Sequence, residues 1–396
     1  MASLSATPGL NPLGDHVVET VHSTKRPFLT IIQSTHASMD GLKRSGLLGR
    51  HRRLLQEYLR EFDVVVYSSD EADYSAELGV RHVPVPWLPR RFGWRHLAFF
   101  LWLVWKAPHM RGVIKVFGSN IPTLPLVRLL SRRPMMVTYQ FDYAGLAKIS
   151  NPDKDFKAMV SQWMERLALT SADLVLVTTS ALQCKIESVY RKATFLSPNW
   201  VDAAECQEAA GQARDPDLIL YAGRLHPIKG VDVLIRAFAR VKEAHHNAKL
   251  LICGIGEEEQ TLRRLVSSLE ICKVEFSGAI PNHELLKLMG RAAIFVLPTM
   301  TMEGHPKALI EAMACGAACV ASKVPGNSDV VVDGETGLLV PPGDVDGLAN
   351  ALTDLMGNVN LRNRLASNAQ YSARTYDFHT IVGADKNAIR GLLGQR

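Results

Sequence analysis

The fold of the second half of the chain is decided by the stretch Glu303-Gly-His-Pro-Lys-Ala-Leu-Ile-Glu-Ala-Met-Ala-Cys-Gly316. It places two carboxylates, Glu303 and Glu311, eight positions apart. Apolar runs at 293–298 and 318–322 flank it, and short apolar runs of this kind predict buried parallel strands. We therefore expect Glu303 in the loop that leaves a strand and Glu311 in the helix that follows, where open parallel sheets bind ligands.

Pro306 and Gly316 bracket this helix, because proline suits the first helical position and glycine suits the end. The neighbours of Glu311 are almost all apolar, and a helix that is apolar on nearly all sides is buried. A buried ionised carboxylate is costly unless it is paired or hydrogen-bonded. We expect Glu311 to be buried and to bind a hydroxyl-rich ligand such as a ribose; the alternative is an ordinary glutamate on a solvated helix face.

The chain of 396 residues is long enough for two domains, each with its own core. Its composition, 47% hydrophobic and 21% charged, is that of a globular protein, and no apolar run is long enough to span a bilayer. Residues 1–24 lack the charged start and apolar centre of a secretory signal, so we expect a flexible polar tail there.

The cysteines follow no metal-binding or disulfide pattern. All six lie after residue 183, no pair has Cys-x-x-Cys spacing, and several fall in apolar runs. This usage predicts reduced core cysteines, a cytoplasmic protein and no metal site.

The first half of the chain predicts a doubly wound α/β domain. Strand patterns at 27–32 and 64–67 enclose a glycine-containing loop and a helix pattern at 47–61, and further strand patterns follow. Gly41 in that loop would let backbone amides approach a phosphate, although a plain loop explains it as well. Asp142 follows the strand at 135–139, at a position that favours ligand contact.

Charge is unevenly distributed along the chain. Residues 1–200 hold 25 Lys+Arg against 16 Asp+Glu, whereas the remainder holds 20 against 23. From Leu78 to Phe141 there is no acidic residue, and this window holds four of the six tryptophans: Trp87, Trp94, Trp102 and Trp105. Residues 87–115 therefore predict docking on an anionic membrane surface, with a buried core helix as the alternative. Nucleic acid is disfavoured, because the aromatics accompany long aliphatic side chains.

The second half repeats strand, loop and helix four times and predicts a second doubly wound domain. After its first strand, Gly223-Arg224-Leu225 leads to Lys229 and a helix at 231–244. A diphosphate needs fixed positive charge, the planar donor fork of arginine and a helix start. Arg224 and Lys229 supply both cations in one loop, although two basic loop residues taken alone are usually only solvated.

Several motifs together resemble one family. They are Gly223-Arg224-Leu225-x-x-x-Lys229-Gly230, Gly254-x-Gly256-x-Glu258, Phe276-x-Gly278, Glu303-x7-Glu311 and Gly334-x-x-Gly337. This set is similar to the donor half of family 4 retaining glycosyltransferases, the glycosyl transferases group 1 with the GT-B fold. The match is dense over 198–375; the first half agrees in layout only, since Phe141-Asp142 stands where the family often has His-Asp.

The resemblance implies a role for each matching residue. Arg224 and Lys229 would bind the nucleotide diphosphate, next to Gly223. Glu311 would bind the ribose hydroxyls, and Glu303 would contact the transferred sugar. The backbone of the segment His305, Pro306, Lys307 and Ala308 would face the sugar and phosphates. Asp142 and Gly41 would contact substrate from the first domain.

The resemblance also implies the reaction and the domain plan. We expect an α/β protein of GT-B fold, with two doubly wound Rossmann-like domains facing a cleft. The domains are expected at 25–201 and 218–375, with a linker at 202–217 and a C-terminal helix at 376–396 that packs back on the first domain.

The expected activity is that of a retaining, metal-independent hexosyltransferase without a cofactor. It would move a sugar from a nucleotide-diphosphate sugar to a glycan or glycolipid acceptor, which we expect to be lipid-linked or part of the cell envelope. The reaction would take place in the cytoplasm or on the cytoplasmic membrane face. A soluble acceptor, or a non-catalytic nucleotide-sugar-binding protein of the same fold, remains the alternative.

Overall fold

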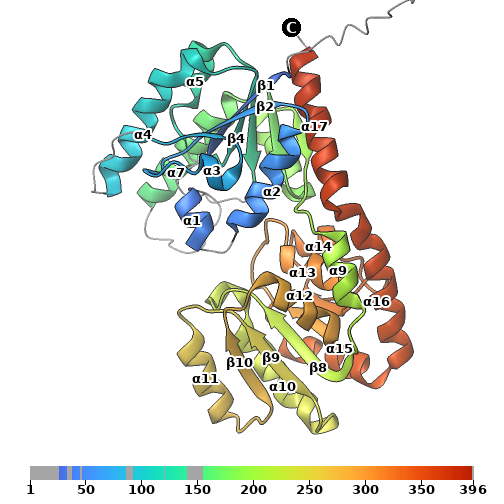
Figure 1. The fold of residues 1–396 in the computed structure, drawn as a ribbon. Coiled ribbons are helices and arrows are strands. Elements are labelled where there is room, and N and C mark those ends of the chain that lie inside the picture. Colours follow the sequence, from blue (N-terminus) through green and yellow to red (C-terminus); the bar gives the residue numbers. More distant parts are fainter. Residues whose placement is uncertain are drawn as a thin grey trace, which may run out of the picture.

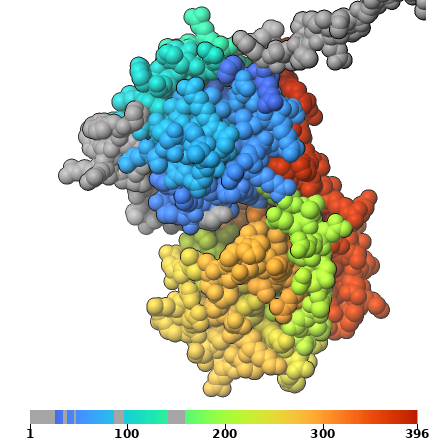
Figure 2. All heavy atoms as spheres, viewed as in Figure 1, coloured from blue at the N-terminus to red at the C-terminus, as the bar shows by residue number. Residues whose placement is uncertain are grey.

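The computed structural model describes residues 26–33, 38–44, 47–85, 92–119, 121–140 and 155–394, with the backbone alone at 92–95 and 155–158. The expected tail at 1–24 lies outside the described residues. The chain forms two lobes, and its last helices run along one side of both (Figure 1, Figure 2).

The first domain is built on a parallel sheet of seven strands in the order β3-β2-β1-β4-β5-β6-β7. The strands are β1 (Phe28–Gln33), β2 (Asp63–Tyr67), β3 (Arg81–Val83), β4 (Val113–Phe117), β5 (Met135–Tyr139), β6 (Leu174–Val177) and β7 (Thr194–Leu196). The helices include α1 (Met39–Arg44), α2 (Leu48–Leu59), α3 (Ser75–Leu78), α4 (Phe92–Lys106), α5 (Leu124–Ser131), α7 (Asp155–Thr170) and α8 (Ser180–Lys185). The strand order reverses between β1 and β4, so the topological switch point lies between these two strands.

Successive residues of a strand point to opposite faces, and this alternation separates two helix layers. Ile114 and Val116 of β4 pack with α4, α5 and α7. Val113 faces the other layer, which contains α2 and the last helix, α17 (Phe378–Gly394). Both faces of the sheet are therefore covered, as a parallel sheet requires.

The second domain has a parallel sheet of six strands in the order β10-β9-β8-β11-β12-β13. The strands are β8 (Asp215–Ala222), β9 (Lys249–Cys253), β10 (Val274–Gly278), β11 (Ala292–Leu297), β12 (Ala318–Ser322) and β13 (Leu338–Val340). The helices include α9 (Ala203–Ala210), α10 (Val231–Ala244), α11 (Glu259–Ser268), α12 (Asn282–Arg291), α13 (Lys307–Ala314), α14 (Asn327–Val330), α15 (Val345–Gly357) and α16 (Val359–Ala373). The two parallel sheets confirm the predicted fold class of two doubly wound domains.

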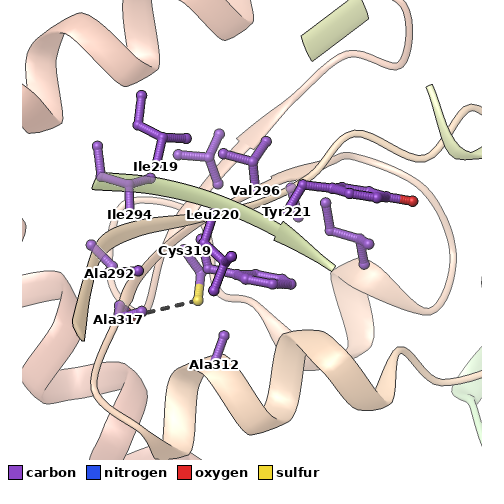
Figure 3. Close-up of a cluster of buried hydrophobic side chains, with 14 of the residues drawn as sticks. Ile219, Leu220, Tyr221, Ala292, Ile294, Val296, Ala312, Ala317 and Cys319 are labelled. Atoms are coloured by element: carbon purple, nitrogen blue, oxygen red, sulfur yellow. Dashed lines mark hydrogen bonds between the residues drawn. The ribbon is translucent and has the colours of Figure 1, made fainter. Parts of the chain in front are cut away.

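Small side chains bring α13 close to this second sheet. Figure 3 shows Ala312 of α13 pointing toward a cluster that includes Ile219 of β8, Ile294 of β11 and Cys319 of β12. All four side chains are fully buried. The helix begins at Lys307, with Pro306 as its N-cap rather than its first residue, and Gly316 has a φ of +78° just after its end.

Most of the segment expected as a linker, 202–217, is helix or strand. Asp202 accepts hydrogen bonds from the amides of Ala204 (3.1 Å) and Glu205 (3.2 Å) and so caps α9. Cys206 and Ala209, three positions apart, are buried against the second domain. The spacing of these small apolar residues is the helical signal that the polar composition concealed.

The chain crosses between the domains twice, and the two crossings pair with each other. The Val201 amide donates to Tyr376 O (2.9 Å), and the Phe378 amide donates to Val201 O (3.0 Å). Arg53 on α2 forms an ion pair with Asp202 and lies over the ring of Phe378. The hinge between the domains is thus bonded through backbone and side chains of both crossings.

After the second crossing, α17 covers the first domain through buried charges. Lys115 of β4 forms an ion pair with Asp385 of α17, and both side chains are less than a tenth exposed. The Tyr58 hydroxyl donates to Asp385 Oδ2 (2.5 Å) and accepts from Lys115 Nζ (2.7 Å). Burial and the neighbouring Asp385 raise the pKa of Tyr58, so the hydroxyl keeps its proton. Removing one partner would leave an unpaired charge in the interior.

Asp385→Ala is therefore expected to lower the free energy of unfolding by about 3–5 kcal/mol, because it leaves Lys115 buried and unpaired. Arg390→Ala is the matched control on the same helix. Arg390 pairs with Glu61 at the surface, and loss of an exposed pair costs about 0–1 kcal/mol. Urea denaturation of both variants measures the difference. Equal small losses would show that the buried pair does not stabilise the docking of α17.

Candidate functional site

Two loops leave the neighbouring strands β8 and β11 at the same edge of the second sheet. The β8 loop carries Arg224 and Lys229, and the β11 loop carries Glu303. The Tyr221 hydroxyl donates to Arg224 O (2.9 Å), so the main chain of Arg224 is fixed while the residue stays exposed. Burial, and then the charge of Glu303, raise the pKa of Tyr221, which keeps this donor protonated.

Glycines let the β9 loop press against the β8 loop. A Cβ on Gly254 would lie 1.8 Å from Gly223 O, and a Cβ on Gly256 would lie 2.1 Å from Leu225 O. Gly254 also has a φ of +144°. The Gly-x-Gly motif is therefore explained by close backbone approach beneath Gly223 and Arg224.

An ion pair joins the two loops. Lys229 Nζ lies 2.5 Å from Glu303 Oε1, and both side chains are mostly buried. The Thr299 hydroxyl donates to the same Glu303 oxygen at 2.8 Å. No other described residue donates to this carboxylate, so Oε2 is available to a ligand. Lys229 and Glu303 thus lie together, as the predicted site requires.

The loop after β12 contacts the main chain of Glu303 and fixes its position. Its amide donates to Pro325 O (2.9 Å). Gly326 follows with a φ of +91°, and a Cβ there would lie 2.4 Å from Glu303 O. Only a residue without a side chain can support Glu303 at this distance.

Glu311 is buried, as the apolar helix predicted, with 4% of its surface exposed. Its partner, however, belongs to the chain itself. Lys307, one turn earlier on α13, lies 2.5 Å from Glu311 Oε1, and Asn282 donates to the same oxygen at 3.4 Å. Lys307, an i,i+4 neighbour, and Asn282 thus satisfy one oxygen of this carboxylate without a ligand. The binding of ribose hydroxyls by Glu311 stays a prediction.

A cavity of about 660 Å³ lies beside Glu311, between the two domains. Glu311, Lys307 and Asn282 line it from the second domain, and Arg50 and Trp200 line it from the first domain and the hinge. We call it the domain-interface cavity. Arg224, Lys229 and Glu303 do not line it; they lie along the strand edge next to it.

His305 faces the hinge rather than open solvent. Its Nδ1 accepts from the Asn199 amide (3.1 Å), and the Asn199 side chain donates to His305 O (2.7 Å). Burial lowers the pKa of His305 to about 4, which keeps Nδ1 an acceptor. The Thr178 hydroxyl of the first domain donates to Gly304 O (2.8 Å). The first domain therefore bonds directly to the loop that carries Glu303.

The remaining predicted residues fall in different places. Pro306 is buried and Ala308 is half-buried at the start of α13, next to the paired Lys307. Gly41 lies in α1, where its amide donates to Ser38 Oγ (3.2 Å). It lines neither the domain-interface cavity nor a smaller cavity of the first domain that is described below. Asp142 lies outside the described residues.

The sequence reasoning missed the polar residues that position the predicted ones. Thr299 orients Glu303, Asn282 contacts Glu311, and Thr178 and Asn199 bond to the loop between them. Each lies just beyond a strand or at a helix start, and that position was the available signal. Within the described ranges, no three His, Cys, Asp or Glu side chains gather in a way that could bind a metal ion.

Comparison with known proteins identifies the family of this chain through a family model and through a curated relative. Residues 203–371 match the family model for glycosyl transferases group 1. A phosphatidyl-myo-inositol mannosyltransferase of Mycobacterium leprae is 30% identical over 275 residues, which cover 68% of this chain and 71% of that protein.

Solved structures agree in fold. Sucrose-phosphate synthase from Thermosynechococcus elongatus superposes with a TM-score of 0.72 at 19% identity, over 93% of this chain and 100% of that one. Anabaena HepE in complex with UDP and glucose gives a TM-score of 0.71 at 18% identity, over 92% and 100% of the two chains. At these identities the likeness shows the fold, which is the predicted GT-B fold.

Gly326→Ala is expected to displace Glu303, because its Cβ would collide with Glu303 O. Lys229, which is paired with Glu303, would move with it, and the binding of nucleoside diphosphates would weaken. Gly334→Ala is the matched control. Gly334 also has a positive φ, +75°, but nothing lies within 4 Å of its added Cβ. Both variants should lose about 1–2 kcal/mol of stability from the left-handed backbone, whereas only Gly326→Ala should also lose ligand affinity in calorimetry. Equal affinities would contradict the supporting role of Gly326.

Proposed function

The chain belongs to the glycosyl transferases group 1 family and is a glycosyltransferase, and we propose that it transfers a hexose with retention of configuration and without a metal ion. The donor is a nucleotide-diphosphate sugar, and the proposed acceptor is a lipid-linked or cell-envelope glycan. The observation that carries the proposal is the meeting of Arg224 and Lys229 with the Glu303–Glu311 segment at one strand edge.

Each residue has a proposed task that its surroundings support. Arg224, exposed beside Lys229, would bind the diphosphate with its donor fork. Glu311 would accept ribose hydroxyls on Oε2, since Lys307 and Asn282 both contact Oε1. Glu303 would accept hydroxyls of the transferred sugar in the same way. Each carboxylate is thus paired with a lysine through one oxygen, and its other oxygen would accept from the ligand.

The proposed chemistry follows from these charges. The bond between the sugar C1 and the diphosphate oxygen breaks, the acceptor oxygen bonds to C1 on the same face, and its proton passes to the departing phosphate. Negative charge grows on that phosphate, where Arg224 and Lys229 stabilise it electrostatically. Glu303, already paired with Lys229, is a weak candidate for a covalent nucleophile, and this supports the retaining route without an enzyme-bound sugar.

The first domain offers a surface that fits a lipid-linked acceptor. Eight large apolar side chains are exposed on α4, α5 and α7: Leu97, Leu101, Trp105, Leu126, Leu129, Leu130, Met159 and Trp163. These helices cover the same face of the sheet, with α5 in contact with both others (Figure 1). We call this surface the outer apolar face. Eight exposed apolar side chains on three adjoining helices support a binding role, because large exposed apolar patches mark interaction sites.

Helix α4 has two apolar sides. Phe99, Trp102 and Leu103 are buried in the core, while Leu101 and Trp105 are 61% and 64% exposed. Of the two alternatives for residues 87–115, the buried core helix therefore applies to one side of α4. Membrane docking remains a proposal for the other side. Trp87 and the side chain of Trp94 lie outside the described residues.

Several observations support docking on anionic lipid at the cytoplasmic membrane face. Arg128, Arg132 and Arg133 lie in or just after α5, and neither α4 nor α5 contains an acidic residue. None of the described helices is long and apolar enough to cross a bilayer. The six cysteines are free thiols, which fits a reducing compartment. The Mycobacterium leprae relative is named for a phosphatidyl-myo-inositol acceptor.

A donor panel tests the site. UDP, GDP and ADP sugars are titrated against the wild type, Arg224→Ala and Glu311→Gln, with thermal unfolding as the readout. One nucleotide at 100 times its Kd should stabilise the wild type by about 2.7 kcal/mol. Loss of a charged hydrogen bond should weaken binding about tenfold or more in both variants.

Arg236→Ala is the control, because Arg236 is an exposed arginine of α10. Slow hydrolysis of the same sugar without acceptor, unchanged by EDTA and releasing the retained anomer by NMR, would support the enzyme proposal over a non-catalytic binder. Absence of any shift in the wild type would contradict donor binding.

A liposome assay tests the outer apolar face. Wild-type protein should sediment with vesicles that contain phosphatidylglycerol at low salt, and less at high salt, because the attraction to the basic residues is screened. Leu101→Ser/Trp105→Ser should reduce binding about tenfold or more, since each side chain contributes apolar burial. Val332→Ser/Tyr371→Ser, two exposed apolar residues of the second domain, is the matched control. Retention of wild-type protein in the supernatant at low salt would refute docking.

A further inference from the structure

A second cavity, of about 330 Å³, opens in the first domain at the carboxyl ends of β1, β4 and β5. We call it the switch-point cavity, because the strand order of the sheet reverses between β1 and β4. Crevices at such points are where doubly wound sheets bind ligands. Its volume lies at the lower end of the range of small-molecule sites, which suits a single ring rather than an oligosaccharide.

Three buried polar atoms around this cavity have no hydrogen-bond partner among the described residues. They are Gln33 Oε1 at the end of β1, His51 Nε2 on α2 and Thr138 Oγ1 on β5. All three residues line the cavity, and each is more than nine-tenths buried. An unpaired buried polar group is costly, so three around one cavity point to a ligand that satisfies them.

The chemistry of these atoms selects hydroxyl groups. Gln33 Oε1 only accepts hydrogen bonds, whereas a threonine hydroxyl can both donate and accept. Burial lowers the pKa of His51 to about 4, so at neutral pH its ring is uncharged and offers one donor and one acceptor. A ligand hydroxyl, itself donor and acceptor, can satisfy every one of these groups.

The charges around the cavity favour a neutral ligand. No Asp or Glu lines it, and its two cations are already occupied. Arg50 donates to Trp200 O (2.5 Å) and lies 3.7 Å from the centre of the Trp200 ring. Lys307 is paired with Glu311. An anion would have to draw one of these cations away from its partner.

Apolar walls complete the cavity. Phe117 at the end of β4, Leu54 of α2 and Trp200 line it together with the polar atoms. The His51 and Phe117 rings meet edge to face, with centroids 5.8 Å apart. Aromatic faces next to hydroxyl-binding atoms suit a ring whose C–H faces are apolar and whose edges carry hydroxyls.

We propose that the switch-point cavity binds a neutral, hydroxyl-rich ring of the acceptor, with Gln33, His51 and Thr138 as its specificity-determining residues. The inference rests on the proposed function, and the position of the cavity connects the two. Lys307, Arg50 and Trp200 line both this cavity and the domain-interface cavity beside Glu311. A ring bound here adjoins the domain-interface cavity beside Glu311.

The proposal predicts that removing one of these polar atoms changes the affinity for the ring but does not lower the unfolding temperature of the protein. If these atoms are unpaired in the free protein, removing one should not lower the unfolding temperature. A structural role would lower it. Thr138→Val removes one hydroxyl at nearly constant shape. Thr123→Val is the matched control, because Thr123 Oγ1 is another buried hydroxyl without a described partner, at the start of α5 and away from the cavity.

The experiment uses the full chain without donor and measures ring binding by saturation-transfer NMR. The probes are myo-inositol and methyl α-mannopyranoside as neutral rings and myo-inositol 1-phosphate as the anionic counterpart. Wild type and Thr123→Val should bind a neutral ring equally. Thr138→Val and His51→Leu should bind it about three- to tenfold more weakly, with unchanged or higher unfolding temperatures.

Three results would overturn the proposal: no binding of either neutral ring, equal binding by Thr138→Val and Thr123→Val, or binding of the phosphorylated ring alone. The donor titration is independent of this test. Ring binding without nucleotide binding would contradict the proposed donor site and uphold the switch-point cavity as a ring site, whereas nucleotide binding without ring binding would do the reverse.

Discussion

The ion pair between Lys229 and Glu303 is the interaction on which the geometry of the candidate site depends. It joins loops 74 residues apart in sequence, from β8 and β11, at 2.5 Å. Both side chains are mostly buried, so removing either one would leave its partner without the pairing that offsets burial. Thr299 and the main chain around Gly326 fix Glu303 from two further directions. The pair therefore keeps a cation and a carboxylate together at the place where a diphosphate and its sugar would be bound.

The second constraint is the way the domains are joined. Val201 and the segment around Asp377 pair through their backbones, and Thr178 and Asn199 bond to the loop that carries Gly304 and His305. The last helix then covers the first domain through the buried Lys115–Asp385 pair. As a result, the cavity at Glu311 and the switch-point cavity open next to each other and share Lys307 and Trp200. Relative domain position, rather than either domain alone, would then set the distance between the proposed donor and acceptor sites.

The sequence predicted the elements that obey a strong local rule. The second-domain strands and the helix α10 at Val231–Ala244 follow from continuous apolar runs and a clear helical period. The burial of Glu311 followed from its apolar neighbours, but its lysine partner was overlooked although it lies one turn away. Helix α9 was hidden by its polar composition. In both cases the sequence held a local signal, the i,i+4 lysine of Glu311 and the spacing of Cys206 and Ala209 in α9, but the surrounding composition was given more weight.

Other features could not be predicted, because they depend on contacts between distant residues. Lys115 is a lone cation in an apolar strand, and only the fold brings Asp385 and Tyr58 to it. The unpaired atoms of Gln33, His51 and Thr138 belong to three separate elements that meet only in the folded domain. The Trp-rich helix was placed correctly as an apolar element, yet only the structure separates its buried side from its exposed one.

The most direct test of the central claim is a crystal structure of the protein with a bound nucleoside diphosphate. The account predicts phosphate oxygens within hydrogen-bond distance of Arg224 and Lys229, and ribose hydroxyls on Glu311 Oε2, with Glu303 still beside Lys229. A nucleotide bound elsewhere, with the Lys229–Glu303 pair untouched and Glu311 in contact with Lys307 and Asn282 alone, would contradict it.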